Sequence, residues 1–414
     1  MNSNFQLGII DKTTRIGIEH DYSAYCYSAL SEFSEPSKRK KFFNWKINFL
    51  IEKLNKIPPP RIRFFKRLTQ TRVISGQNMA DNISGLEIPA CDVCGKPAVV
   101  EQAYSGRILC GEHLAKSVRK KVAKELRKQL ILKKGQHTTI FVAISGGKDS
   151  AALLELLVDI LGIRPDVTII AGTVDEGIEG YRPPSLQCAI DLCDDLGVEF
   201  VTVSYKELGF EEMDTVAKLI PGMTETNPSA PSMPCSYCGV FRRQGINHLA
   251  KKVNADVMAL GHNLDDMAQT VLMNMSNGDL ERTLRLAPHT TTPIDGLPPR
   301  IVPLRWIPEQ EVHLYAVYKK LPIHHEECPH ARGALRWRHR EMVAAMEADV
   351  PGTRHGLVRM ADNVKELRNQ VLELGGGTTR PDPPKKCPVC DSMTSNNRCK
   401  ACEMRDMLNK ELET

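Results

Sequence analysis

The chain has 414 residues, of which 42% are hydrophobic and 25% charged, and its formal net charge is +5 at pH 7. This length predicts two or more structural units, and the composition is that of a soluble globular protein. No apolar stretch approaches the ~20 residues of a membrane span, and the N-terminus lacks the features of a secretory signal, so we expect a cytoplasmic protein with no membrane partner.

Residues 1–85 form a basic extension to which the sequence assigns no role. The first 80 residues hold 14 Lys and Arg against 6 Asp and Glu. Met79, shortly before the first cysteine pair, would make a natural start codon. Further basic clusters occur at residues 119–121, 242–243 and 332–340. Such patches suit a phosphate backbone, although solvated helix faces produce the same pattern.

Two sets of four potential metal ligands flank the middle of the chain. They are Cys91, Cys94, Cys110 and His113 near the start, and Cys387, Cys390, Cys399 and Cys402 near the end. Thirteen cysteines in an intracellular chain favour metal sites over disulfides. Four thiolate or imidazole ligands at such short spacing predict tetrahedral zinc without an open position. We therefore expect two structural zinc modules, residues 86–115 and 385–414, which could also grip RNA.

Residues 116–374 predict an α/β domain with a helical C-terminal part, reached through a charged helical stretch at 116–133. Apolar runs typical of strands occur at residues 138–144, 167–173, 198–203 and 255–260. Helical patterns occur at residues 150–161, 185–196, 211–220, 239–253, 266–275, 308–320, 334–348 and 355–374. Near-continuous Val and Ile runs separated by helices predict a parallel sheet covered on both faces. A Gly- and Pro-rich linker at 375–384 would separate this domain from the last module.

The segment Ser-Gly-Gly-Lys-Asp-Ser, which starts at Ser145, lies between a predicted strand and a predicted helix. Such a turn directs several backbone N–H groups at an anion. It is no Walker A loop, because Lys148 is followed by Asp149. It looks like the PP-loop of ATP pyrophosphatases, which split ATP between the α and β phosphates. Gly146 and Gly147 would let the backbone approach phosphate, and Asp149 could help to hold Mg²⁺.

A second segment, Gly-His-Asn-Leu-Asp-Asp, starts at Gly261 and follows another apolar strand. Its adjacent carboxylates, Asp265 and Asp266, are expected at a helix N-terminus, where the dipole favours negative charge. There they could bind a metal–nucleotide complex. Alone, such a pair is usually a capped helix start, but downstream of a PP-loop it is the expected partner motif.

A third group of cysteines consists of Cys235, Cys238 and the distant Cys328. Three thiolates are one ligand short of a closed zinc site, and they suit a [4Fe-4S] cluster whose fourth iron stays open. Alternatively, low-pKa thiolates beside Arg242 and Arg243 could carry a persulfide without iron. An inert pair and an unrelated third cysteine would give the same pattern.

Together, these motifs resemble those of the tRNA 2-thiouridine synthetases of the TtuA type, a layout shared by the cytosolic wobble-uridine thiolation enzymes. The resemblance covers residues 91–402. It implies that ATP adenylates the C2 oxygen of a tRNA uridine and that sulfur then displaces AMP. It also implies tRNA as a partner, a ubiquitin-like sulfur carrier with a C-terminal thiocarboxylate, and a possible homodimer.

The same resemblance implies the site residues and cofactors, which are ATP, Mg²⁺, two Zn²⁺ ions and a [4Fe-4S] cluster. Catalysis would depend on Lys148, Asp266, Cys235, Cys238 and Cys328. The nucleotide would be bound by Ala143, Ser145, Gly146, Gly147, Lys148, Asp149, Ser150, Gly261 and Asp266. Some relatives use a lysine shortly after the cysteine pair, where this chain has Arg242 and Arg243. Arginine cannot accept a proton, so a phosphate-binding role is expected there instead.

Two other functions remain open at this point. A PP-loop ligase could form an amide from an adenylated carboxylate, but it has no use for three additional cysteines. An RNA-binding scaffold could carry a regulatory or inactive nucleotide loop, but the intact Lys148, Asp149 and Asp266 argue against it. Whether the target uridine lies at the anticodon wobble position or in the T-loop is also left open.

Overall fold

The computed structural model describes residues 88–289, 296–331, 335–374 and 385–413. The expectations for the basic extension at 1–85, for Met79 and for the linker at 375–384 lie outside the described residues. Among the residues described, no helix combines the length and the apolar character that crossing a membrane requires.

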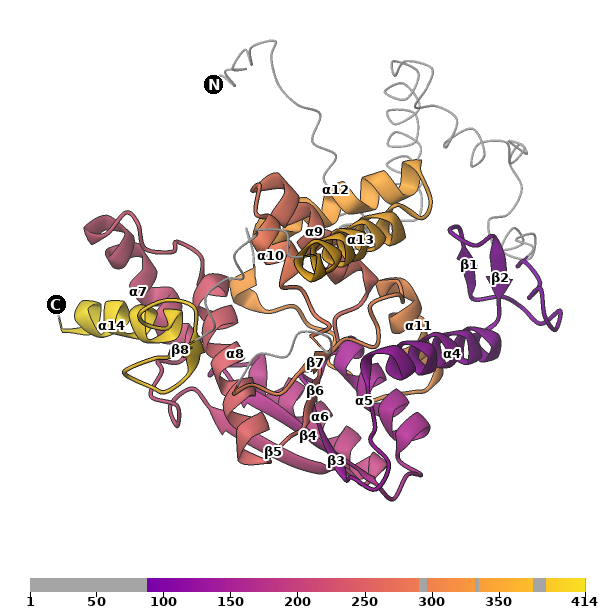
Figure 1. Ribbon diagram of the computed structural model, residues 1–414, viewed down its shortest axis with the longest axis horizontal. Helices are drawn as coiled ribbons and strands as arrows, with labels where there is room; N and C mark the ends of the chain where they lie inside the picture. Colours follow the sequence, from indigo (N-terminus) through magenta and orange to yellow (C-terminus); the bar gives the residue numbers. More distant parts are fainter. Residues whose placement is uncertain (1–87, 290–295, 332–334, 375–384, 414) are drawn as a thin grey trace, which may run out of the picture. The chain divides into compact units, whose positions relative to one another are not determined.

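The centre of the fold is a five-stranded sheet in the order β5-β4-β3-β6-β7, and every neighbouring pair is parallel (Figure 1). Its strands are β3 (Thr138–Ala143), β4 (Val167–Asp175), β5 (Glu199–Ser204), β6 (Val257–Ala259) and β7 (Arg300–Ile301). The predicted α/β class with a parallel sheet is thus confirmed. The strand β7 was not predicted, because a two-residue strand is too short to show a periodic pattern.

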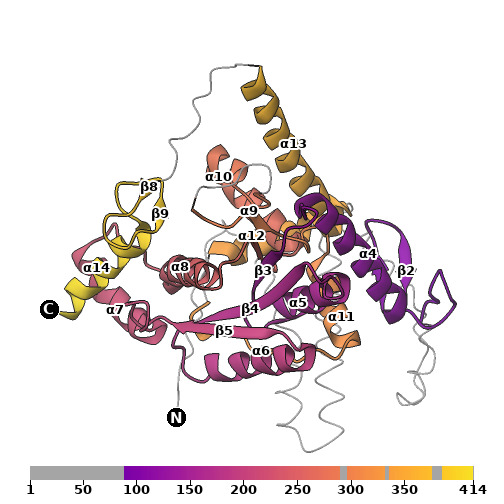
Figure 2. The same ribbon diagram turned by 60° about the horizontal axis from the view of Figure 1, so that its bottom comes forward.

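Alternation along β3 sends neighbouring side chains to opposite faces of the sheet. Ile140 and Val142 belong to one core with α5 (Lys148–Leu161) and α6 (Arg182–Leu196). Phe141 belongs to the other, with α7 (Met213–Thr226) and α8 (Pro234–Lys252). Figure 2 shows α6 and α8 on opposite sides of β4 and β5. This arrangement confirms that helices cover both faces.

The remaining helices form a layer around α9 (Leu264–Ser276). They are α10 (Leu280–Leu284), α12 (Leu335–Asp349) and α13 (Thr353–Glu373), whereas α11 (Glu309–Tyr318) packs on α5 and belongs to the core that contains Ile140. Leu264, Met267 and Ala268 of α9 share a small apolar core with Val343 of α12 and Val358 of α13. This packing brings α12 and the start of α13 next to the start of α9.

Both cysteine-rich modules pack into the main cores. The first contains β1 (Val100–Gln102), antiparallel to β2 (Arg107–Leu109), and leads into α4 (Gly111–Gln129). The last contains β8 (Lys385–Lys386), β9 (Met393–Thr394) and α14 (Lys400–Leu412). Leu109 belongs to the core around α5, and Leu408 to the core around α8.

Several helix boundaries differ from the predicted ones. The helix expected at 116–133 begins at Gly111 and ends at Gln129, so His113 lies in its first turn. The helix expected at 239–253 begins at Pro234, because proline has a preformed helical φ and needs no N–H in the first turn. Cys235 and Cys238 therefore lie one turn apart on the same helix.

Candidate functional site

The loop after β3 has a backbone conformation that requires glycine. Gly146 has φ +80°, and a Cβ there would lie 1.9 Å from the carbonyl oxygen of Ser185. The Ser150 hydroxyl accepts a hydrogen bond from the Ser145 N–H (3.1 Å) and donates one to the Gly147 carbonyl (3.0 Å). This hydroxyl braces the loop internally, whereas the sequence suggested that it would face phosphate.

Lys148 lies between two carboxylates. Its Nζ is 3.0 Å from Asp149 and 2.9 Å from Glu309 at the start of α11. Burial lowers the pKa of Lys148, but the charges and hydrogen bonds of Asp149 and Glu309 outweigh burial and raise it above its usual range. Lys148 therefore stays protonated and offers a fixed positive charge to a phosphate. No motif marks Glu309, which is 161 residues away, so sequence reasoning missed it.

The second predicted motif packs directly on the first. A Cβ on Gly261 would lie 3.2 Å from the Ser150 nitrogen, so the two segments approach closely. Asn263 caps α9 in a capping box with Asp266 and donates a hydrogen bond to the Asp149 carboxylate (2.9 Å). Burial, and the nearby charge of Asp266, raise the pKa of Asp149. Asp149 and Asp266 are therefore the two carboxylates that could share a metal ion here.

The adjacent Asp265 has a different set of partners. It accepts a hydrogen bond from the Glu309 N–H (2.8 Å) and pairs with Arg354 at the start of α13 (2.8 Å). Burial raises its pKa. This carboxylate joins α9 to α11 and α13 and is therefore engaged by other partners than its neighbour Asp266.

Helix α12 brings two more cations to the loop. Arg336 pairs with Asp266 (3.1 Å), and Arg340 pairs with Glu309 (3.3 Å). Both side chains remain about half exposed, at 47% and 48%. They belong to the basic cluster at 332–340 that the sequence associated with phosphate, and with Lys148 they give the nucleotide side three cations.

The structure brings together Cys235, Cys238 and Cys328. The Cys235 thiol contacts the carbonyl oxygen of His330 in the 3₁₀ helix η3 (Pro329–Ala331), at 3.6 Å. Burial raises the pKa of Cys235, and the neighbouring Cys238 adds to the effect. Burial likewise raises the pKa of Cys328, with contributions from both other thiols. The expected low-pKa thiolates are therefore wrong for Cys235 and Cys328.

The spacing of these three thiols differs from that of the two predicted metal quartets. The Cys91–Cys94–Cys110–His113 and Cys387–Cys390–Cys399–Cys402 ligand atoms all lie within 4.8 Å of one another in each set. In the part of the chain that the structure describes, Cys235, Cys238 and Cys328 do not form such a group. A single ion needs the tight arrangement, whereas a cubane cluster presents a different iron to each ligand and fits a wider one.

The two quartets are suited to metal ions. Burial raises the pKa of Cys91 and of Cys387, but hydrogen bonds from backbone N–H groups outweigh it and lower each pKa to about 6. The thiolate is the form that binds metal. His113 is in hydrogen-bonding contact with Cys110 (3.3 Å).

A chain of three charges, of which Glu176 and Arg182 are buried and Arg242 is exposed, connects the PP-loop to the thiols. Arg182 donates a hydrogen bond to the Ser145 carbonyl (3.2 Å) and lies 3.0 Å from Glu176. Glu176 pairs with Arg242 (2.7 Å), which donates a hydrogen bond to the Cys238 sulfur (3.3 Å). Glu176 and Arg182 are only 3% and 4% exposed. Both follow the carboxyl end of β4, the position at which ligands bind in such sheets, and that signal could have identified them.

A second connection runs along the backbone. The His324 N–H donates a hydrogen bond to the Gly146 carbonyl (2.9 Å), and Cys328 follows four residues later, a span of at most about 14 Å. The three thiols and the PP-loop therefore lie at the same edge of the sheet, the one at which its strands have their carboxyl ends. The two neighbouring arginines have different surroundings. Arg242 donates a hydrogen bond to the Cys238 sulfur, whereas Arg243 lies near another cation, Arg282, whose charge, together with burial, lowers the pKa of Arg243.

Comparison with known proteins reveals a consistent set of relatives. Residues 91–115 match the family model of the N-terminal LIM domain of the 2-thiouridine synthetase TtuA. The tRNA 2-thiolation protein NcsA of Haloferax volcanii is 36% identical over 327 residues, covering 76% of this chain and 97% of the relative. The cytoplasmic tRNA 2-thiolation protein 1 of Drosophila melanogaster is 31% identical, covering 77% and 88%.

A solved structure agrees with these relatives. The U34-tRNA thiolase NcsA from Methanococcus maripaludis, solved with its [4Fe-4S] cluster, is 31% identical in sequence. Its TM-score with this chain is 0.62, and the match covers 76% of this chain and 95% of that chain.

Proposed function

The chain belongs to the family of tRNA 2-thiolation enzymes, and on this basis we propose that it thiolates C2 of a tRNA uridine, at position 34, through an adenylated intermediate. The observation that carries the proposal is the continuity of the site. A chain of three side chains, Arg182, Glu176 and Arg242, connects the PP-loop to the three-thiol site at the carboxyl edge of the sheet. Activated base and incoming sulfur need this proximity, because sulfur must attack C2 and displace AMP, which leaves with the former C2 oxygen, before water attacks the same carbon.

The nucleotide side performs the activation. The C2 oxygen of the uracil bonds to the α-phosphorus of ATP while the bond to the bridging oxygen breaks and pyrophosphate leaves. The N–H groups around Gly147 and the charges of Lys148, Arg336 and Arg340 bind the departing pyrophosphate. Asp149 and Asp266 hold Mg²⁺. Adenylation is required because the carbonyl oxygen of a nucleobase is a poor leaving group.

The thiol side supplies sulfur. Cys235, Cys238 and Cys328 would hold a [4Fe-4S] cluster, which when bound would supply iron able to bind sulfur. The Arg242 guanidinium beside Cys238 favours anionic sulfur nearby. Tyr205, whose pKa burial raises, stays protonated and donates to the Cys238 sulfur (3.6 Å). The U34-tRNA thiolase NcsA from Methanococcus maripaludis was solved with its [4Fe-4S] cluster, which favours a cluster over the iron-free persulfide alternative here.

The remaining parts of the proposal rest on the family resemblance. The two quartets hold structural zinc in modules at residues 86–115 and 385–414, on either side of the PP-loop domain at 116–374. A ubiquitin-like carrier with a C-terminal thiocarboxylate delivers sulfur. The enzyme works in the cytoplasm, as a homodimer.

The test uses the full chain, purified without oxygen, with ATP, Mg²⁺, sulfide and unmodified tRNA. We expect 2-thiouridine in the nucleoside mass spectrum, AMP in equal amount, and no product from a tRNA carrying cytidine at position 34. Cys328→Ala should abolish thiolation without weakening ATP binding. AMP release without a thiolated nucleoside, or full activity of the Cys328→Ala enzyme, would contradict the proposal and favour the ligase or the scaffold.

A further inference from the structure

A basic groove is lined by residues of α4 and of the start of α13. Its volume is about 440 Å³, and it is lined by Lys121, Lys124, Glu125, Lys128, Trp306, His355 and Arg359. Four of these residues are cations and one is a carboxylate. Glu125 is only 5% exposed, and its two oxygens accept hydrogen bonds from Lys128 and Gln129, so the groove presents mainly positive charge.

Two of the cations have their charge available for a ligand. Lys124 and Arg359 are exposed, and within the described ranges neither has a carboxylate within ion-pair distance. The pKa of the nearby His355 is also affected by positive charges in this groove. Burial, and then the charges of Lys121 and Arg359, lower the pKa of His355 to about 4. His355 is therefore a neutral ring at physiological pH.

An aromatic surface lies beside these cations. The Trp306 ring is stacked with the His355 ring at 13° between planes and 6.2 Å between centroids, and the Arg305 guanidinium lies 5.0 Å from its centroid; the indole remains partly exposed. The Tyr104 ring, from the first cysteine-rich module, also packs on the His355 ring, with 4.5 Å between the two centroids. A row of cations beside an aromatic ring is the arrangement that binds single-stranded nucleic acid, with phosphates on the cations and a base on the ring.

The groove adjoins the nucleotide site. Trp306 is three residues before Glu309, which pairs with Lys148, so the two lie at most about 10 Å apart along the chain. His355 follows Arg354, which pairs with Asp265. A strand lying in the groove would thus lead directly to the PP-loop.

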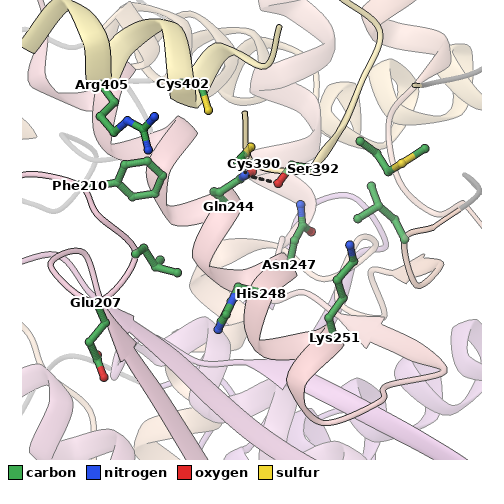
Figure 3. Close-up of a pocket in the computed structure, with 13 residues that line it drawn as sticks. Glu207, Phe210, Gln244, Asn247, His248, Lys251, Cys390, Ser392, Cys402 and Arg405 are labelled. Carbon is green, nitrogen blue, oxygen red and sulfur yellow. Dashed lines mark hydrogen bonds between the residues drawn. The ribbon is translucent and has the colours of Figure 1, made fainter. Parts of the chain in front are cut away.

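We propose that this basic groove binds the substrate RNA next to the target uridine, with backbone phosphates on Lys124 and Arg359 and a flanking base in contact with the exposed part of Trp306. The inference rests on the proposed function and assigns it a docking surface. A second cavity lies between α8 and the last cysteine-rich module (Figure 3).

The second cavity, of about 340 Å³, lacks these properties. Its aromatic residue, Phe210, is buried and stacked on Phe241. Its polar group Gln244 donates hydrogen bonds to Ser392 and to the sulfur of Cys390, so it holds the last module in place. The exposed Lys251 at this cavity and its neighbour Lys252 provide a matched control on the surface of another helix.

The first test measures tRNA affinity of the full chain over a range of salt concentrations. Lys124→Glu/Arg359→Glu should weaken binding at least tenfold and reduce the slope of log K against log salt by about 2, one for each lost phosphate contact. Lys251→Glu/Lys252→Glu should retain the affinity and slope of the parent chain. Melting temperature, iron content and ATP affinity should stay unchanged in both. Parental affinity and slope in the first variant, or a larger loss in the second, would overturn the proposal.

The second test probes stacking directly. Added tRNA should quench tryptophan fluorescence in the parent chain and in Trp337→Phe, but much less in Trp306→Phe, because a base stacked on an indole quenches it. Quenching that survives in Trp306→Phe would refute the stacking contact. Because thiolation is measured separately, a groove variant with normal tRNA binding and thiolation disproves the groove alone, whereas a parent chain without thiolation disproves the proposed function.

Discussion

The PP-loop and the three-thiol site both lie at the carboxyl edge of the sheet but are built in different ways. The PP-loop is braced by its own residues, since Ser145, Gly147 and Ser150 hydrogen-bond among themselves. The thiols come from two distant segments and depend on other residues for their position. His330, for example, pairs with Asp214 (2.6 Å), whose other oxygen accepts the Glu179 N–H. Arg182 and His324 also contact the PP-loop, but its turn is formed by neighbouring residues, whereas the three thiols are brought together only by contacts between distant segments.

The largest effect is expected at Lys148, the centre of the local site. Lys148→Met removes the fixed charge that would meet the pyrophosphate and leaves Asp149 and Glu309 without their shared cation. We expect AMP formation to fall about 10³-fold, measured as initial rate, with the iron signal unchanged. Lys116→Met, at an exposed lysine paired with Glu112, should keep the parental rate. A parental rate in Lys148→Met would remove the loop from the chemistry.

The same contrast explains what could be predicted from the sequence. The strand, turn and helix around Gly146 are contiguous, and each quartet has its ligands in short pairs, so spacing alone predicted them. The fold class followed from the apolar runs. Glu309 could not be predicted because its partner Lys148 is 161 residues away. The Arg182–Glu176–Arg242 chain depends on the side-by-side placement of β4 and α8, which no local pattern encodes.

The connection between the two sites should be broken by Glu176→Gln. This change removes the charge that separates two arginines, so Arg182 and Arg242 would repel each other and release both the Ser145 carbonyl and Cys238. We expect thiolation to fall about 10- to 100-fold. Because Glu176 acts through other residues, the visible and EPR spectra of the cluster should also change.

Glu179→Gln provides the matched control, since Glu179 is an exposed glutamate on the same segment. It should leave the rate and the spectra unchanged. If Glu176→Gln lowers the melting temperature but leaves the cluster spectrum and the ATP affinity intact, then Glu176 has only a structural role and the two sites are not coupled through it.

A smaller effect is expected from the cations of α12. Arg336→Gln/Arg340→Gln removes two half-exposed charges that are each paired with a carboxylate. We expect about a tenfold rise in the KM for ATP with little change in kcat. Arg338→Gln, at another exposed arginine of the same helix, should have no effect. A tenfold rise in the KM for ATP in Arg338→Gln would mean that the charge or fold of the whole helix, and not the two ion pairs, determines ATP binding.

The smallest effect concerns stability at the local site and its dependence on pH. Burial raises the pKa of Asp149, so the folded protein binds this proton more tightly than the unfolded chain, and ionised Asp149 lowers stability at neutral pH. Asp149→Asn keeps the oxygen that accepts from Asn263, and it should raise the melting temperature by a few degrees at pH 7 while abolishing Mg²⁺-dependent activity. The difference in melting temperature between variant and parent should shrink as the pH falls through the raised pKa.

Asp166→Asn is the control with a shift of the other sign. Arg164 lowers the pKa of Asp166, so this variant should melt no higher than the parent. A destabilised Asp149→Asn would show instead that its pairing with Lys148 outweighs burial, and that the local site is held by its charges as much as by its backbone.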